Sequence, residues 1–406
     1  MITKFSDRKD RMGAVRVLHN PLASSDVDTG PVGRAPLEFH RRLPEYAPTP
    51  LVDAPKLADS LGVGRVWVKD ESLRLGLPAF KILGASWAVY RALDEHSRKH
   101  LGRGLEPWED IGGLNERIEP LRPLTLAAAT DGNHGRAVAH MAKLLGLRSR
   151  IFVPSDMVPA RVEAIEQEGA KVTVIDGTYD EAVARSAEEA DERCLVISDT
   201  SWPGYVNVPT WVIEGYSTIL WEVHDELARR GEEGPTLVVA QIGVGAFAAA
   251  VTRHFRAPGT SPQPRMLGVE PARAACMLSS VEAGRIVHLP GPHDSIMAGL
   301  NCGTPSMIAW PIVSRGIDVF VSVEDEWARE AMRALATSDI ISGETGGAGL
   351  AGLLALMQGA ERERSRRLLG IDGETRVLLF NCEGATDPTA YARIIGEPGR
   401  TSEMRS

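Results

Sequence analysis

Cysteine, lysine, aromatic residues and long apolar runs are all scarce in this sequence. Its 406 residues include 4 cysteines and 5% aromatics. The cysteines form no C-x-x-C pair and no H-E-x-x-H motif occurs, so we expect no metal site. No apolar run approaches the roughly 18 residues of a membrane helix, and the start, MITKFSDRKD, lacks the apolar core of a secretory signal. We therefore expect a cytoplasmic protein without a membrane partner.

The sequence also lacks an excess of the charge that nucleic acids attract. Its formal net charge is -9, and no arginine cluster stands apart from balancing acids, which argues against a nucleic-acid partner. With 43% hydrophobic and 24% charged residues, the composition is that of a globular protein with a substantial core. A small molecule is the expected partner.

What the sequence does contain is an alternation of apolar, strand-like runs with helical patterns. Strands that are apolar on both faces and separated by helices are typical of parallel sheets covered on both sides, so the predicted fold class is α/β. Breaks in composition predict a nested small domain at 85–203 within a large domain formed by 1–84 and 204–406. The strand-like runs are 65–70, 124–130, 149–154, 170–176, 194–199, 236–242, 265–271, 318–323 and 376–382.

Glycine-rich loops follow several of these runs, at the strand ends where open parallel sheets bind ligands. In GVGAF, the amides at a helix N-terminus suit a single phosphate. Ala248 occupies the third glycine position of the dinucleotide pattern, so a Rossmann dehydrogenase is the least favoured interpretation. Each loop alone is also compatible with an ordinary turn or close helix packing. The loops are ATDGNHGR (129–136), QIGVGAF (241–247), SGETGGAG (342–349) and FNCEGATDP (380–388).

Lys81 stands out among only eight lysines. It lies between Phe80 and Ile82 in LPAFKILGAS, an apolar frame in which desolvation could keep its amine neutral for Schiff-base formation. The ordinary alternative is a surface lysine whose stem lies along the protein. Lys69 is the other candidate, but the two acids that follow it can pair with it. Lys81 and the glycine loops together suggest a phosphorylated cofactor that carries an aldehyde.

These motifs resemble those of the fold-type II pyridoxal-phosphate enzymes, the tryptophan-synthase-β-like group. Within it, an ordered set of segments from about residue 37 to 396 resembles the diaminopropionate ammonia-lyases. The resemblance implies two domains, each a mainly parallel twisted sheet with helices on both faces, with pyridoxal 5'-phosphate in the cleft between them, and a homodimer. The segments are FHRRLPEYAPTPL, TDGNHGR, SDTSW, PTWVIEGYSTI, IMAGLNCGTPS and EGATDP.

The resemblance also implies roles for individual residues. Lys81 matches the Schiff-base lysine, Asn133 the asparagine that hydrogen-bonds the cofactor's ring hydroxyl, and Cys382 the small side chain beside the pyridine nitrogen. The implied cofactor-binding residues are Phe80, Lys81, Asn133, Gly243, Val244, Gly245, Ala246, Phe247, Glu344 and Cys382. The implied substrate-binding residues are Thr130, Asp131, Gly132, Asn133, His134 and Asp199.

Asp131 distinguishes the ammonia-lyases from the serine and threonine dehydratases of the same fold, which usually have a small or hydroxyl residue there. An aspartate could act as a base on the face opposite Lys81, so that both D- and L-2,3-diaminopropionate are accepted. Asp199 matches a second acid near the substrate's amino group, although a turn cap is the alternative. With Lys81, Asp131 and Asp199 as catalytic residues, the resemblance implies elimination to pyruvate and ammonia, in amino-acid catabolism.

Two questions stay open. Ala385, Pro203 and Val206 replace residues that are usually more polar in the lyases, so β-elimination or β-replacement on another β-substituted amino acid, as in a serine/threonine dehydratase or a synthase, is an alternative. A non-catalytic cofactor-binding protein is a second one. Cys276 and Cys302 could approach closely enough for a disulfide, although a cytoplasmic protein favours free thiols.

Overall fold

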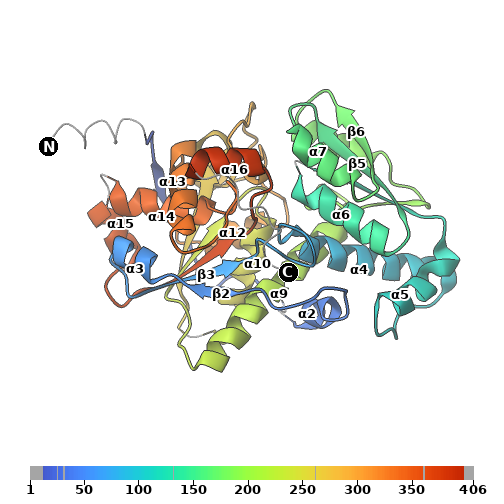
Figure 1. Ribbon diagram of the computed structural model, residues 1–406, viewed down its shortest axis with the longest axis horizontal. Helices are drawn as coiled ribbons and strands as arrows, with labels where there is room; N and C mark the ends of the chain where they lie inside the picture. Colours follow the sequence, from blue (N-terminus) through green and yellow to red (C-terminus); the bar gives the residue numbers. More distant parts are fainter. Residues whose placement is uncertain are drawn as a thin grey trace.

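The computed structural model describes residues 12–24, 26–30, 33–130, 132–260, 262–359 and 362–396. Two sheets organise these residues (Figure 1). The larger has the strand order β1-β10-β9-β8-β11-β3-β2. The two outermost pairs, β1 with β10 and β2 with β3, are antiparallel, and the inner pairs are parallel. Its strands are β1 (Arg16–His19), β2 (Leu51–Asp53), β3 (Arg65–Asp70), β8 (Leu237–Gln241), β9 (Arg265–Pro271), β10 (Val319–Val323) and β11 (Arg376–Asn381).

The smaller sheet is parallel throughout and has the order β6-β5-β4-β7. Its strands come from one continuous stretch of chain, between α4 and α9. They are β4 (Thr125–Ala129), β5 (Arg148–Pro154), β6 (Lys171–Ile175) and β7 (Cys194–Val196). In Figure 1 this sheet and its helices lie to the right of the larger sheet.

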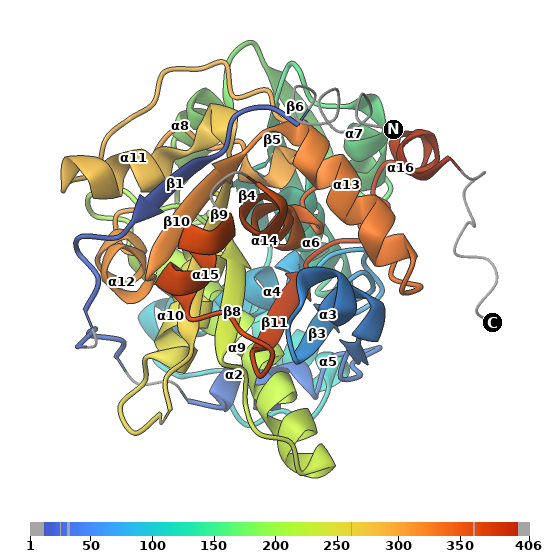
Figure 2. The same cartoon turned by 90° about the vertical axis from the view of Figure 1, so that its left-hand side faces the viewer.

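Helices cover both faces of each sheet. Figure 2 shows α13, α14 and α15 in front of the strands of the larger sheet and α4 behind them. Helices α9 and α10 pack with α4 in the core on the face of β8 opposite to α14. The helices are α2 (Ala35–His40), α3 (Pro55–Leu61), α4 (Lys81–Leu101), α5 (Ile111–Ile118), α6 (Asn133–Leu144), α7 (Pro159–Glu166), α8 (Tyr179–Ala187), α9 (Asn207–Arg230), α10 (Ala246–Phe255), α11 (Cys276–Ala283), α12 (Trp310–Gly316), α13 (Asp325–Ala336), α14 (Ala348–Gln358), α15 (Arg362–Leu369) and α16 (Pro388–Ile395).

The period-2 alternation of side chains explains this arrangement. Along β8, Val238 and Ala240 enter the core that includes α9 and α10, whereas Leu237 and Val239 enter the core that includes α14. The strands of the smaller sheet likewise divide their side chains between a core on the α6 side and a core on the α8 side. Both sets of side chains are apolar because both faces are buried.

The sequence-based expectations for the fold hold well. The α/β class is confirmed, and each of the nine strand-like runs contains a strand. The two antiparallel edge strands, β1 and β2, were not predicted. The exact division into a nested and a large domain stays a prediction.

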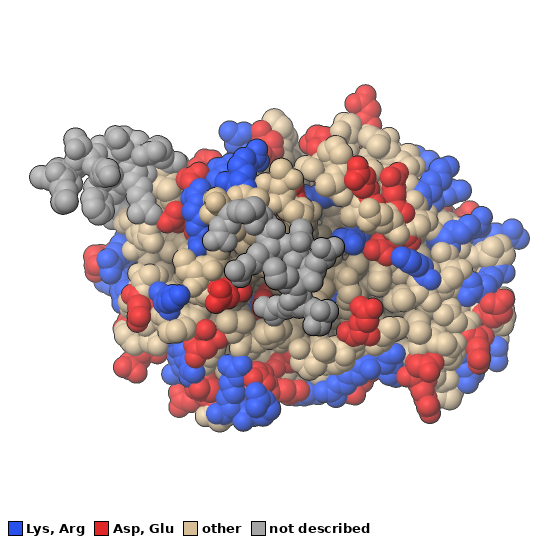
Figure 3. Space-filling model, in the orientation of Figure 1, with Lys and Arg blue, Asp and Glu red and all other residues tan. Residues whose placement is uncertain are grey.

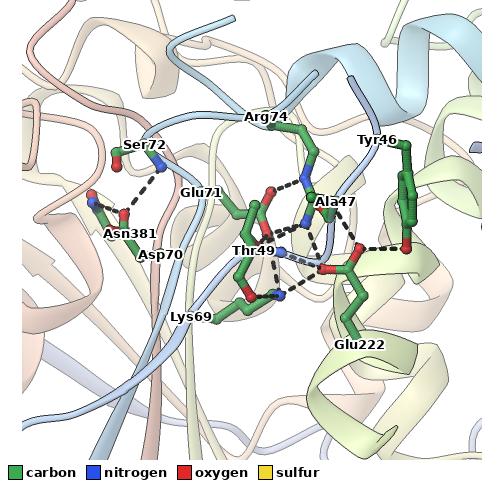
Figure 4. Close-up of polar contacts among 10 residues, drawn as sticks. All are labelled: Tyr46, Ala47, Thr49, Lys69, Asp70, Glu71, Ser72, Arg74, Glu222 and Asn381. Carbon is green, nitrogen blue, oxygen red and sulfur yellow. Dashed lines mark hydrogen bonds and ion pairs between the residues drawn. The ribbon is translucent and has the colours of Figure 1, made fainter. Parts of the chain in front are cut away.

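A buried ionic cluster, formed by Lys69, Glu71, Arg74 and Glu222, fixes the loop that leads from β3 to Lys81 (Figure 4). Lys69 Nζ donates to Glu222 Oε2 at 2.6 Å, and the Arg74 guanidinium donates to both carboxylates. The side chains are at most 3% exposed. Two positive and two negative charges balance one another, so no uncompensated charge is buried.

The cluster continues toward the end of β11. Asn381 donates to the Asp70 carboxylate at 2.8 Å, and the Glu71 amide donates to the Asn381 carbonyl. Further along the loop, the Phe80 amide donates to the carbonyl of Cys382. The segment before Lys81 and the segment after β11 are therefore held as one unit.

Candidate active site

An open cavity of about 720 Å³ lies at the carboxyl ends of strands from both sheets. Many of the predicted site residues line it, although they are far apart in sequence. Those that line it are Phe80, Lys81, Asn133, Asp199, Gly243, Val244, Gly245, Ala246, Phe247 and Cys382. This volume includes space that is open to solvent.

Lys81 and Asp199 form an ion pair inside this cavity. Lys81 is the first residue of α4, and its Nζ lies 2.7 Å from Asp199 Oδ2. Tyr179, at the start of α8, donates to the other oxygen of the same carboxylate at 2.9 Å. Burial alone would raise the pKa of Asp199, but the charge of Lys81 and the hydrogen bonds from Lys81 and Tyr179 hold that pKa well below its ordinary value. Asp199 is therefore ionised at neutral pH.

Aromatic side chains frame the lysine, as its sequence context predicted. The rings of Phe80, Tyr216 and Phe247 pack against one another with centroids 4.7 to 6.2 Å apart. Lys81 Nζ lies 5.9 Å from the centroid of the Phe80 ring. Burial raises the pKa of the Tyr216 hydroxyl, which stays neutral. The Lys81 amine thus has an apolar side and a carboxylate side.

Asn133 is held in the cavity by Glu383. Its side-chain Nδ2 donates to Glu383 Oε2 at 2.5 Å, and the Thr345 backbone amide donates to Glu383 Oε1 at 3.0 Å. Glu383 is 1% exposed. Because a carboxylate only accepts hydrogen bonds, the contact determines which end of the Asn133 amide faces Glu383.

The loop from Gly243 to Phe247 carries backbone amides toward the cavity. Among the described residues, none accepts a hydrogen bond from the amides of this loop. Gly245 has φ +99°, and an added Cβ would lie 2.9 Å from Met277 Cε. The helix that follows, α10, contributes the positive end of its dipole. The loop is built to receive an anion without a lysine or arginine.

Comparison with known proteins identifies the family. The model of the pyridoxal-phosphate dependent enzyme family matches residues 42–372. The chain is also 36% identical over 403 residues to a diaminopropionate ammonia-lyase of Salmonella typhimurium, an alignment that covers 97% of each protein. The chain belongs to the pyridoxal-phosphate-dependent enzymes, in the group of the diaminopropionate ammonia-lyases. Its cofactor is pyridoxal 5'-phosphate.

Solved structures of this group agree with the fold. The Escherichia coli diaminopropionate ammonia-lyase in complex with D-serine has a TM-score of 0.85 and 32% identity, covering 94% of this chain and 97% of that one. The same enzyme in complex with an aminoacrylate-PLP azomethine reaction intermediate has a TM-score of 0.84 and 32% identity, covering 95% and 97%. The architecture of the fold-type II group therefore extends over nearly the whole chain.

The residues present fit this cofactor. The unengaged amides of the Gly243–Phe247 loop suit its phosphate, and Lys81, which lines the same cavity, would supply the amine for its aldehyde. Burial raises the pKa of the Cys382 thiol well above its ordinary value, so this side chain is neutral. A neutral thiol suits the environment of an unprotonated pyridine nitrogen.

Some predicted residues do not line the cavity, and one lies outside the described residues. Thr130 and Gly132 form a turn in which the Gly132 amide donates to Thr130 Oγ1, and His134 bonds the carbonyl of Ile197 through Nε2. Burial lowers the pKa of His134, which is therefore neutral. Glu344 is buried, and burial raises its pKa. Asp131 lies outside the described residues.

The cavity also contains residues that sequence reasoning missed. Tyr179 and Arg161 come from the first turns of short helices with ordinary amphipathic sequences, so no local signal marks them. Glu383 lies two residues after the end of β11 and could have been found as an acid in a glycine loop. The further lining residues are Gln241, Gly299, Leu300, Cys302 and Thr345.

The expectations that remain concern a disulfide, membrane helices, metal ligands and surface charge. All four cysteines are buried free thiols, so the structure does not contain the hypothesised Cys276–Cys302 disulfide. In the described part of the chain, no helix is long and apolar enough to cross a membrane, and no cluster of three or more potential ligands is placed to hold a metal ion. On the face shown in Figure 3, basic and acidic side chains are interspersed.

Proposed function

We propose that this enzyme catalyses the α,β-elimination of 2,3-diaminopropionate, in the D form, the L form or both, to pyruvate and ammonia. The observation that carries the proposal is the Lys81–Asp199 ion pair beside a phosphate-binding loop, in a chain that aligns over 97% of its length with a diaminopropionate ammonia-lyase. The bound cofactor supplies an electron sink for the charge that develops at Cα. The protein supplies binding, orientation and proton transfer.

Lys81 would hold the cofactor's aldehyde carbon and afterwards carry a proton at Nζ. Because Nζ lies beside Asp199, a proton taken up from Cα is stabilised there by the nearby carboxylate. Asp199, fixed by Tyr179, is placed to receive a cationic amino group of the substrate. The β-amino group leaves as ammonia, and hydrolysis of the released enamine gives pyruvate and a second ammonia.

The remaining predicted residues would bind rather than react. Asn133, oriented by Glu383, would donate to the ring oxygen of the cofactor, and the turn that includes Thr130, Gly132 and His134 would hold the substrate carboxylate. Asp131 would exchange the Cα proton on the face opposite Lys81. Glu344 would support the Thr345–Glu383 contact from the adjoining loop.

A spectrum and an activity assay test this proposal. The purified protein with added pyridoxal phosphate should show an absorption band in the visible-violet region, as expected for this cofactor joined to a lysine, and Lys81→Ala should lose this band. Pyruvate should form from diaminopropionate faster than from serine or threonine. A colourless wild-type protein would refute the cofactor site, and faster pyruvate formation from serine would refute the substrate. Incorporation of an added nucleophile would indicate β-replacement instead.

The proposals for assembly and location rest on the family resemblance and the acidic composition. We infer a homodimer in the cytoplasm that acts on a small amino acid and does not bind nucleic acid. Light scattering coupled to gel filtration would give twice the chain mass for a dimer, and a mass equal to one chain would contradict it.

A further inference from the structure

Several polar contacts connect the two sheets around the cavity. Lys81 with Asp199, and Asn133 with Glu383, join them through side chains that the cofactor and substrate engage. A further contact, between Ser201 and Ser306, uses only hydroxyl and backbone groups that the proposed chemistry leaves alone.

The Ser201 contact leads directly to the phosphate-binding loop. Ser201 Oγ lies 2.8 Å from Ser306 Oγ and accepts a hydrogen bond from the Ile308 amide at 3.2 Å. The Ser306 amide in turn donates to the carbonyl of Val244 at 2.8 Å. Ser306 is 1% exposed, whereas Ser201 is half-buried. The middle of the phosphate-binding loop is thus linked through two serines to the segment that carries Asp199, two residues before Ser201.

Unlike the Lys81–Asp199 pair, the link through Ser201 and Ser306 does not involve a residue that changes its bonding during the proposed reaction. Lys81 changes its bonding when it holds the cofactor and when it exchanges a proton, so its contact with Asp199 cannot fix the carboxylate throughout the reaction. The partners of Ser201 and Ser306 are each other and the backbone groups of Ile308 and Val244, and Lys81 is not among them. Tyr179 also holds the Asp199 carboxylate, but Tyr179 and Asp199 both belong to the chain around the smaller sheet, so this contact does not fix Asp199 relative to the phosphate-binding loop. The serine pair supplies that connection across the cavity.

We propose that Ser201 and Ser306 form a positioning pair that couples the Asp199 segment to the phosphate-binding loop across the cavity. The pair holds Asp199 at a fixed distance from the bound cofactor while Lys81 exchanges partners. The inference rests on the proposed cofactor site and does not depend on which amino acid is the substrate.

Hydrogen exchange of the holoenzyme without substrate tests the coupling. Ser201→Ala removes one hydroxyl and leaves Ser306 in place. We expect exchange to accelerate roughly fivefold, the effect of losing one net hydrogen bond, in peptides covering 198–206 and equally in peptides covering 242–248. Release of pyridoxal phosphate should accelerate to a similar extent. The loss of visible absorbance measures this release while a scavenging protein binds the free cofactor.

Two further variants separate coupling from local damage. Ser201→Thr keeps the hydroxyl and should restore exchange at 242–248 to the wild-type rate. Ser186→Ala, which removes another buried hydroxyl that bonds only within its own helix α8, should leave 242–248 unchanged. Faster exchange confined to 198–206 in Ser201→Ala would overturn the proposal, as would a Ser201→Thr variant that behaves like Ser201→Ala. A failure of the cofactor site itself would be seen earlier, as a wild-type protein without visible absorbance.

Discussion

The side-chain amide of Asn133 and the carboxylate of Glu383 lie 2.5 Å apart, although 250 residues separate them in sequence. Since Glu383 also accepts the Thr345 amide, both of its oxygens are engaged. Asn133 retains one amide hydrogen and its carbonyl oxygen for the cofactor. In the proposed site, Glu383 would thus determine which way the Asn133 side chain is turned toward the cofactor ring.

Glu383→Gln should disturb this arrangement while preserving shape. A glutamine side chain turns an NH₂ group toward either Asn133 or Thr345, so one of these donors loses its acceptor. We expect a shifted visible absorbance maximum of the bound cofactor and roughly tenfold weaker cofactor binding, measured by equilibrium titration. Glu168→Gln is the matched control, because Glu168 is a buried acid that contacts His140 and Lys143 and does not line the cavity. An identical spectrum in Glu383→Gln and wild type would refute the role.

Asp131→Asn tests the two-base proposal. If Asp131 exchanges the Cα proton on the face opposite Lys81, its loss should lower kcat for D-diaminopropionate by about 100-fold or more and affect the L form much less. Pyruvate formation from each enantiomer measures the effect. Equal losses on both enantiomers would contradict the proposal.

Gly245→Ala should weaken phosphate binding. At φ +99° an alanine is strained, and its Cβ would lie 2.9 Å from Met277 Cε and 3.1 Å from Ala309 Cβ, so the loop must shift. We expect weaker binding of pyridoxal phosphate and a smaller effect on pyridoxal, which has no phosphate. Gly259→Ala is a control with a similar φ of +86° and no atom within 4 Å of the added Cβ. Equal losses for both ligands would place the effect outside the phosphate contacts.

Glu222→Gln tests the buried ionic cluster. Burial alone would raise the pKa of Glu222, but Arg74 and Lys69 lower it to about 2, from an ordinary 4.5. Its contribution to stability is therefore fully present above pH 4.5 and is lost as pH falls toward 2. At neutral pH the substitution should cost about 3–5 kcal/mol in the free energy of unfolding, measured with urea, because it leaves buried cations unbalanced.

The difference between Glu222→Gln and wild type should shrink as the pH falls below 4.5. Glu38→Gln, which removes the exposed partner of Arg41, should change the stability by less than about 1 kcal/mol at any pH. A pH-independent loss in Glu222→Gln would mean that packing, rather than charge balance, sets the cost.

The sequence predicted best those strands and residues whose local pattern of apolar residues follows directly from their burial in the fold. The parallel strands are continuous apolar runs because both faces are buried, and Lys81 was recognisable because its neighbours are apolar. The edge strands β1 and β2 have only four and three residues and are partly exposed, so they carry little pattern. Lys69 was expected to pair with the adjacent acids, and it does contact Glu71 at 3.8 Å. Its closer partner, Glu222, is 153 residues away, and only the packing of α9 reveals it.

The same distinction applies to the site. Asn133 and the Gly243–Phe247 loop are marked by glycine motifs at strand ends, whereas Tyr179 and Arg161 reach the cavity from helices whose sequences look ordinary. Their contribution depends on where α7 and α8 pack, which no short-range pattern encodes. The ion pair between Lys81 and Asp199 similarly joins the start of α4 to the chain beyond β7.

The antiparallel strand β1 has a consequence for how the chain can be shortened. Arg16–His19 pair with residues 319–322 of β10, a strand that is buried throughout and apolar except for Ser322. A chain that begins after Asn20 would leave the backbone groups of β10 open along an apolar edge, which is a template for pairing between molecules. Trimming the N-terminus to this point should therefore yield aggregates rather than a smaller enzyme, even though every residue of the cavity is retained.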